Sequence, residues 1–413
     1  MKKTFKIVVN LALVGLLLWF LSAHQEKIRK SVTSRDSIAY WATGKLLLHR
    51  QNPYSVPSVL ALEAGQGYAA DRPLMFRTPP WSLWMVLPIG FLSSFWAWVV
   101  WLAILLASLV IAMRISWRMY GDSGDGPESR TAPAAFLLTG YLFAPVAACL
   151  VAGQMGMVLL LGVALFLLFE QEERYSYLAG AALLLPMAKP HIFASFFLVL
   201  AFWVIARKRW SLVGGAAAAF VAANLIALAF DPSIFRHYRE MLQQQSIQRE
   251  FIPALSGMIR GIFFRKYFWV QFAPFLLGLI WSAYFYWKHR LTWSWRQHGP
   301  AVLVVSLLTT PYSWMTDEVV LLPAILQAVV WLMRAKLKVF SQLVVLLFVC
   351  LDLLLLLIIR AQVSPATGIY FWSSLVWFGW YFYARRIHRV QSERGEASPT
   401  LPTKNIEVSS AAR

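Results

Sequence analysis

The sequence predicts an all-α polytopic membrane protein, and three observations support this fold class. Hydrophobic residues make up 59% of the 413-residue chain and charged residues only 14%, whereas a soluble domain carries about 25% charged residues. Apolar runs such as 5–23 and 340–358 have the length that a membrane-spanning helix needs. The short alternating segments that are typical of a transmembrane β-barrel do not occur.

Apolar run length and the breaks between runs predict about twelve spanning helices, with roughly eleven to thirteen as the range. The first run follows the basic start MKKTFK but precedes no clear small-x-small cleavage pattern, so we expect an uncleaved first helix rather than a signal peptide. The expected spans are 5–23, 94–116, 133–152, 155–170, 176–188, 190–206, 211–230, 268–287, 299–313, 317–334, 341–359 and 370–384.

The distribution of basic residues predicts the orientation of these spans. Segments such as RISWR, RKRW, RAKLK and ARRIHR lie on one side, whereas the short connections 153–156 and 311–315 contain no basic residue. The positive-inside rule then places both termini in the cytoplasm. We expect residues 1–390 to form a single membrane domain and the polar tail, residues 391–413, to be disordered.

Two outer loops, 24–93 and 231–267, conflict with this rule because both are rich in Lys and Arg. A basic outer surface that attracts an anionic lipid substrate explains the conflict. The first loop ends in the segment 77–94, whose apolar run of about ten residues is short for a span and suits a re-entrant or interfacial segment. If this segment does span, the total becomes about thirteen and the N-terminus lies outside.

The bulk composition also limits the partners. The net charge of +19 fits anionic lipid headgroups rather than nucleic acid, because the basic residues are dispersed between spans. Cys149 and Cys350 both lie in apolar runs and indicate neither a disulfide framework nor a metal site. No nucleotide-binding or hydrolase motif occurs in the sequence. We therefore expect a substrate that arrives from the membrane or its outer face, and no cofactor or metal.

The first candidate catalytic residue is Asp36, in the stretch RDSIAYW after the first span. A helix that begins at Arg35 with Ser34 as its cap would place Asp36 next to Tyr40, one turn later. Apolar residues at helical spacing predict that this helix is amphipathic and lies on the outer membrane surface. From spacing alone, the carboxylate serves either the helix dipole or catalysis.

Four further polar residues lie beside or inside apolar runs. Lys189, between two prolines in LLLPMAKPHIF, needs a partner at membrane depth, and it either reaches the interface or contacts a phosphate. Asp317 and Glu318 begin an apolar helix, and the helix dipole accounts for both. Asp352 lies inside an apolar run and is either a functional acid or a polar contact that faces the bundle.

The order of these stretches resembles glycosyltransferase family 87, a family of polytopic enzymes that use lipid-linked phosphosugars. The family's Asp-x-x-x-Tyr element appears as RDSIAYW, its G-x-(D/N)-P-Y stretch as RQNPYS, and its aromatic-x-Tyr-Pro-Pro element as FRTPPW. Its G-Q-x-N appears as GQMG, its A-G-(apolar)-K-P segment as AGAALLLPMAKP, and a subgroup's S-P-Y-x-W-x-x-D pattern as TPYSWMTD. Single positions depart from the pattern, including the glycine before NPY and the Asn after GQ. The resemblance extends over residues 33–325.

The resemblance implies a GT-C-like architecture and an inverting hexosyltransferase with Asp36 as the catalytic base. The donor would be a polyprenyl-phosphate sugar carrying mannose, another hexose or a pentose relative. The acceptor would be an envelope glycan or glycolipid, and the active site would face the extracytoplasmic side of a bacterial plasma membrane. A lipid or glycan transporter (flippase) and a non-catalytic envelope assembly factor are the alternatives. The residues expected to bind the donor phosphate or the substrates are Tyr40, Tyr54, Gln154, Lys189, Arg260 and Asp317.

Overall fold

The computed structural model confirms the all-α prediction, because every regular element in the described part of the chain is helical. Nearly all of the expected first span and the last residues of the chain lie outside the described residues. The structure describes residues 22–23, 35–121, 132–245, 252–335, 337, 339–363 and 368–396.

Five helices among the described residues are long and apolar enough to cross a membrane. Two shorter helices, α6 (Ala132–Leu142) and α7 (Ala144–Ala152), form a sixth candidate span with a bend of 41° between them. The prediction of about twelve spans is therefore not confirmed. The five long spans are Ser94–Gly121 (which contains α5, Ser94–Ser116), Trp210–Phe230 (α11), Phe268–His289 (which contains α14, Ala273–His289), Met315–Arg334 (which contains α16, Leu322–Arg334) and Val339–Arg360 (α17).

Several expected spans are too short in the structure. The expected span 176–188 contains only α9 (Ser176–Ala182), after which the chain turns through η6 (Pro186–Ala188), because a proline does not continue a helix. The apolar helices α8 (Gly156–Phe169) and α10 (Ala194–Arg207) have 14 residues each, whereas a span needs about 20. The other α-helices are α3 (Asp36–Leu48), α4 (Val56–Ala64), α12 (Ile234–Gln244), α13 (Leu255–Phe263), α15 (Trp295–Thr309) and α18 (Trp372–Glu396). The 3₁₀ turns besides η6 are η1 (Pro80–Met85), η2 (Pro88–Phe91), η5 (Glu173–Tyr175), η8 (Phe268–Phe272), η9 (Met315–Leu321) and η10 (Gly368–Tyr370). One π-helical turn, η3 (Trp117–Gly121), follows α5.

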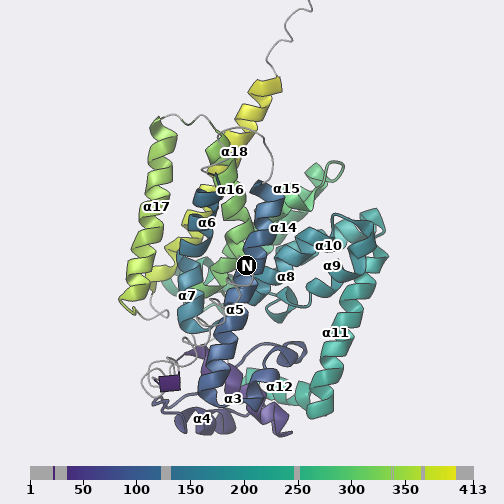
Figure 1. The fold of residues 1–413 in the computed structure, drawn as a ribbon, viewed down its shortest axis with the longest axis vertical. Helices are drawn as coiled ribbons and strands as arrows, with labels where there is room; N and C mark the ends of the chain where they lie inside the picture. The colour runs from purple at the N-terminus through teal and green to yellow at the C-terminus, as the bar shows by residue number, and fades with distance from the viewer. Residues whose placement is uncertain are drawn as a thin grey trace, which may run out of the picture.

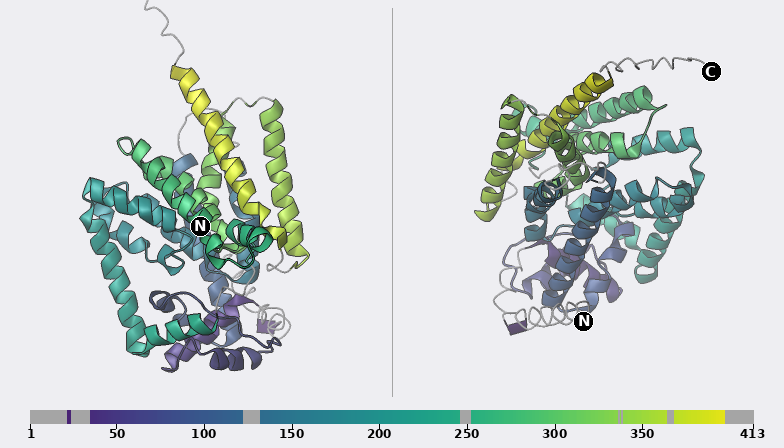
Figure 2. Two further views of the ribbon diagram at one scale, coloured as in Figure 1. Left: turned by 180° about the vertical axis from the view of Figure 1, so that it is seen from behind. Right: turned by 45° about the horizontal axis from the view of Figure 1, so that its top comes forward.

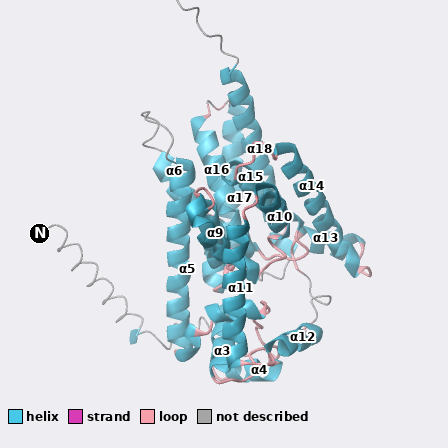
Figure 3. Ribbon diagram, turned by 90° about the vertical axis from the view of Figure 1, so that its right-hand side faces the viewer, coloured by secondary structure: helices cyan, strands magenta, loops and turns pink. Residues whose placement is uncertain are grey.

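The helices form one bundle whose two ends differ (Figure 1). The short helices α3, α4 and α12 close one end, and α11 runs along the side of the bundle to reach α12 at that end. At the opposite end α18 extends beyond the other helices, and α17 lies on the outside of the bundle (Figures 1 and 2). Figure 3 shows α3, α4 and α12 gathered at the same end from the side. Helix α3, which begins at Asp36, therefore lies at one end of the bundle.

Helix α3 is buried on most of its surface, so the prediction that it is amphipathic is wrong. It begins at Asp36 after an Arg35 cap that makes no side-chain hydrogen bond, and most of its residues are buried. Gly44 allows this packing, because a Cβ there would lie 2.2 Å from the Val86 carbonyl oxygen. The Trp41 indole donates to the Leu92 carbonyl at 2.9 Å. Small and apolar residues on several sides of α3 are buried, so the apolar spacing that predicted one buried face did not reveal the others.

The segment 77–94 forms the two short turns η1 and η2, and neither is long enough to span a membrane. The segment packs inward instead. Trp81 lies against Phe220 of α11, with 5.1 Å between ring centroids, and its indole donates to the Met187 carbonyl at 2.9 Å. These contacts fix the chain two residues before Lys189.

Candidate active site

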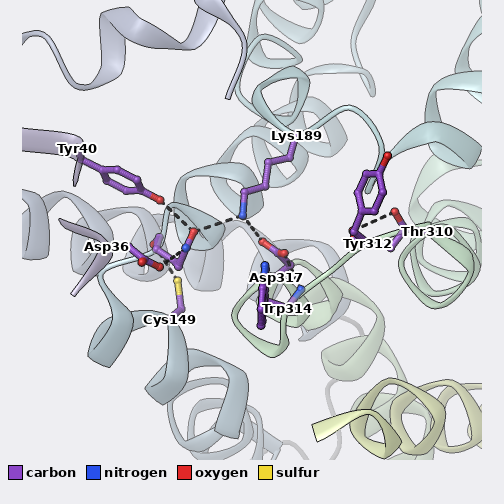
Figure 4. A network of polar contacts seen from close by, with 9 residues as sticks. Asp36, Tyr40, Cys149, Lys189, Thr310, Tyr312, Trp314 and Asp317 are labelled. Carbon is purple, nitrogen blue, oxygen red and sulfur yellow. Dashed lines mark hydrogen bonds and ion pairs between the residues drawn. The ribbon is translucent and has the colours of Figure 1, made fainter. Parts of the chain in front are cut away.

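Five side chains from four separate segments form one polar network (Figure 4). The Gln154 amide nitrogen donates to Asp36 Oδ2, and the Tyr40 hydroxyl donates to Gln154 Oε1 at 3.0 Å. Lys189 Nζ donates to the same Gln154 oxygen at 3.3 Å and to Asp317 Oδ1 at 2.6 Å. The structure thus brings together five of the seven residues that the sequence and the family resemblance single out.

Asp36 is the first residue of α3 and remains partly exposed while most of the helix packs inward. Tyr40 lies one turn later on the same face, as the four-residue spacing predicts. The rings of Phe76 and Trp101 each pack edge-on against Tyr40, with 5.2 Å between centroids. Burial raises the pKa of Asp36, and the hydrogen bond from Gln154 and the charge of Lys189 oppose this rise. A raised pKa makes the ionised carboxylate a stronger base.

The Gly153–Gln154 dipeptide ends α7 and directs the amide toward Asp36. Gly153 has a φ of 70°, in the left-handed region that favours glycine. A Cβ at this position would lie 2.9 Å from Ser37 Cβ, so a larger residue would press against α3. The Trp101 indole holds the turn by donating to the Gly153 carbonyl at 2.8 Å. These contacts explain why a glycine precedes Gln154 at this turn.

Lys189 lies in the irregular turn between η6 and α10, and its partner is Asp317. Both side chains are largely buried, with 12% of Lys189 and 2% of Asp317 exposed. This ion pair answers the question that the sequence raised about a lysine at membrane depth, because a buried charge needs a partner.

Asp317 has two roles at the start of η9. Its Oδ2 accepts from the Trp314 backbone N–H at 3.0 Å, which is the capping role expected of an acid at a helix start. Its Oδ1 accepts from Lys189. The Thr310 hydroxyl donates to the His191 carbonyl at 3.0 Å, which joins the segment before η9 to the turn that carries Lys189. These hydrogen bonds therefore fix the positions of the two segments that carry Asp317 and Lys189.

Two predicted site residues lie outside the network. Tyr54 is buried, and its hydroxyl donates to the Thr78 carbonyl at 2.9 Å. Arg260 lies on α13 with its guanidinium group 5.3 Å from the centre of the Phe268 ring. Helix α13 does reach the segment before η9, because the Ser256 hydroxyl donates to the Thr310 carbonyl at 2.8 Å.

The other acids of the sequence analysis have internal partners. Asp352 accepts from the Ala144 backbone N–H at 2.9 Å, so it makes the polar contact inside the bundle that was one of its two interpretations. Glu318, next to Asp317, accepts from the Ser373 hydroxyl at 2.6 Å and from the Trp377 indole at 2.7 Å. Neither acid takes part in the network around Asp36.

Sequence reasoning missed Glu63, a fully buried acid on α4. One of its oxygens accepts from the Leu74 backbone N–H at 3.0 Å, and the other has no hydrogen-bond partner among the described residues. Burial raises the pKa of Glu63 to about 7, and the Asp36 carboxylate acts on it in the same direction. A lone acid within the apolar stretch VLALEA is the signal that marks this position.

The network can combine a base with a cation. Asp36 provides a carboxylate that can accept a proton, and Lys189 provides a charge that can stabilise a developing anion. Both contact the same Gln154 amide. In the described part of the chain, no three His, Cys, Asp or Glu side chains come together as a ligand set for a metal ion.

Comparison with known proteins identifies the family. Residues 76–351, about two thirds of the chain, match the model of glycosyltransferase family 87. No curated protein and no solved structure matches the chain. The match begins after Asp36 and Tyr40 but contains Gln154, Lys189 and Asp317, which the network joins to them. The chain therefore belongs to glycosyltransferase family 87 and is a membrane glycosyltransferase.

Proposed function

We propose that this enzyme transfers a sugar, mannose or another hexose, from a polyprenyl-phosphate donor to an envelope glycan or glycolipid, with inversion at the anomeric carbon. Asp36 acts as the base and Lys189 as the cation beside the leaving phosphate. The observation that supports this assignment is the contact of both residues with one amide, that of Gln154. A base and a cation on a common support are what a transfer from a phosphate leaving group needs.

The reaction follows from these positions. An acceptor hydroxyl attacks the anomeric carbon while its proton moves to the Asp36 carboxylate. The bond between the anomeric carbon and the phosphate oxygen breaks, and its electron pair leaves with the polyprenyl phosphate. The phosphate gains a negative charge, which Lys189 stabilises in a site of low dielectric constant. Atoms and charge balance without a further reactant.

The outer face of the membrane is the side that the charge pattern favours for this site. The span Met315–Arg334 carries Asp317 at its start and Arg334 at its end. Helix α5 likewise begins beside the turn that follows α4, where the Ser94 hydroxyl donates to Gln66 at 2.6 Å, and it has Arg114 in its last turn. The positive-inside rule assigns the basic ends to the cytoplasm, so the opposite end faces outward.

Two other functions remain as outcomes of the test, namely a flippase and a non-catalytic assembly factor. Asp352 and Lys189 suggested transport because an intramembrane charge often marks a transport path. Asp352 is hydrogen-bonded to Ala144 and Lys189 is paired with Asp317. The buried charges of these two residues are thus accounted for without a transport path.

The test measures transfer from radiolabelled polyprenyl-phosphate mannose to a lipid extract by enzyme reconstituted in proteoliposomes. We expect transfer by the wild type and a loss of about 10²- to 10⁴-fold in Asp36→Asn. Asp352→Asn is the matched control, since it removes a second partly buried acid and should keep the wild-type rate. Movement of the donor across the bilayer without transfer would identify a flippase. Normal envelope glycan in cells that carry Asp36→Ala, Lys189→Ala and Asp317→Ala would identify an assembly factor.

A further inference from the structure

The Gln154 amide is the only group that contacts both Asp36 and Lys189 among the described residues of the network. We infer that Gln154 is a positioning residue that leaves Asp36 Oδ1 as the oxygen that takes the proton and directs one N–H of Lys189 toward the leaving phosphate. This inference rests on the proposed transfer reaction, and it assigns the work within the site to particular atoms.

The chemistry of its neighbours fixes the orientation of the Gln154 amide. Its oxygen accepts from the Tyr40 hydroxyl and from Lys189 Nζ. A rotated amide would point its NH₂ group at the ammonium of Lys189, which has no lone pair with which to accept. Only one orientation is therefore compatible with Lys189, and it directs the amide N–H groups to Asp36.

This orientation makes the two oxygens of Asp36 inequivalent. Oδ2 accepts from the Gln154 amide, whereas Oδ1 has no hydrogen-bond partner among the described residues. The Asp36 side chain is partly exposed, so an acceptor hydroxyl has access to it. After Oδ1 takes the proton, Oδ2 still accepts from the amide as the carbonyl oxygen of a neutral acid. Gln154 can therefore hold the carboxyl group in both protonation states.

The N–H groups of Lys189 can be assigned to acceptors in the same way. Its ammonium has three N–H groups, of which one donates to Asp317 and one to Gln154. One N–H is left for a phosphate oxygen, and 12% of the side chain is exposed. Asp317 keeps its position when Lys189 contacts a phosphate, because the Trp314 backbone N–H donates to the second oxygen of Asp317. Lys189 can thus contact the donor without breaking its ion pair.

Loss of the amide should change the pH dependence of the reaction. The charged groups that face Asp36 are Lys189 from the turn after η6, Asp317 from η9, Arg35 before α3, and Glu63 from α4. Gln154 adds a hydrogen bond that favours the ionised form of Asp36. Without it Asp36 binds its proton more readily, so the fall in activity on the acidic side should move to higher pH.

The experiment compares Gln154→Met with the matched control Gln327→Met. Gln327 is buried and, like Gln154, accepts from a tyrosine, here Tyr381 at 2.9 Å, but its amide donates to the Arg296 carbonyl rather than to an acid. We expect Gln154→Met to lower kcat by about 10²-fold, as for a misplaced catalytic group, and to move the acid limb of kcat/KM upward by about one pH unit. Gln327→Met should change neither quantity.

A folded Gln154→Met variant with the wild-type kcat and acid limb would overturn the inference. If this variant does not fold, Gln154→Glu decides instead. A carboxylate against Asp36 Oδ2 should move the acid limb further upward, and an unmoved limb would equally overturn the inference. The proposed function fails separately, namely if the wild type transfers no sugar or if Asp36→Asn transfers it at the wild-type rate.

Discussion

Asp317 and Glu318 are adjacent in η9 and equally buried, with 1% and 4% of each residue exposed, yet they enter different environments. Asp317 meets the ammonium of Lys189, and Glu318 meets two neutral donors, Ser373 and Trp377. The first acid belongs to a group of charges that reaches Asp36. The second joins η9 to α18, the last helix of the bundle.

The comparison teaches that burial alone does not mark a catalytic acid. Both carboxylates are satisfied, as buried polar groups must be. They differ in whether the partner is a cation with a hydrogen left to donate. Lys189 has such a hydrogen, and the partners of Glu318 donate theirs to the carboxylate. We therefore assign chemistry to the side of η9 that carries Asp317 and fold stability to the side that carries Glu318.

The largest expected effect comes from breaking the ion pair. Lys189→Met leaves Asp317 buried without its cation and should lower the free energy of unfolding by about 3–5 kcal/mol. The double variant Lys189→Met with Asp317→Leu removes both charges and should recover most of that stability, because a pair of apolar residues needs no partner. Neither variant should transfer sugar. Thermal unfolding in detergent and the transfer assay measure the two effects, and a double variant as unstable as the single one would contradict this account.

Glu318→Gln should affect stability but not chemistry. The amide nitrogen of Gln cannot accept from a donor as the carboxylate oxygen does, so one of the two hydrogen bonds is lost, at a cost of about 1–3 kcal/mol. The rate per folded molecule should equal that of the wild type. A lower melting temperature with an unchanged rate supports the division between the two acids, and a lost rate in a folded variant argues against it.

Gly153→Ala tests how the site is held. The substitution strains a residue with a φ of 70° and places a methyl group 2.9 Å from Ser37 Cβ, so the Gln154 amide should move and transfer should fall by about tenfold or more. Gly67→Ala is the matched control, because Gly67 has a φ of 97° but open space around its Cβ position. If Gly67→Ala loses as much of the transfer rate as Gly153→Ala does, then backbone strain, and not the position of Gln154, causes the loss.

The smallest expected effect concerns Glu63. Its pKa of about 7 in the folded enzyme exceeds the ordinary value of 4.5, so the folded state binds more protons than the unfolded state between these values. Stability should therefore fall as the pH rises through that window. Glu63→Gln should flatten this dependence, since its amide oxygen can still accept from Leu74. Melting temperatures at about pH 5 and about pH 8 measure it, with Asp71→Asn, in the segment that follows α4, as the control. A slope as steep as that of the wild type would exclude Glu63.

The sequence predicted the features of the site that depend on the spacing of neighbouring residues. Asp36 and Tyr40 lie on one face of a helix, and the lysine at membrane depth has a partner. The partner itself, Asp317, lies 128 residues away along the chain, and Gln154 lies 118 residues from Asp36. Spacing says nothing about contacts of that range, and the family motifs supplied the candidates.

The errors of the sequence analysis have one physical cause. The α3 region and the short helix α8 are apolar because they pack inside the bundle, and α10 packs inward with only one side. Hydrophobicity looks the same whether the neighbour is lipid or another helix, so the twelve expected spans are not confirmed by the described helices, and α3 is buried on most sides instead of being amphipathic. Burial against the backbone at Gly44 is a feature of the tertiary structure that no periodicity reveals.

The central claim is that Asp36 accepts the proton, and the pH dependence of kcat/KM tests it most directly. Burial raises the pKa of Asp36, and only the ionised form can act as a base, so activity should be present above this pKa and lost as the pH falls through it. The account predicts an acid limb above the ordinary carboxyl range in the wild type and none in the residual activity of Asp36→Asn. The same limb in both enzymes would contradict it.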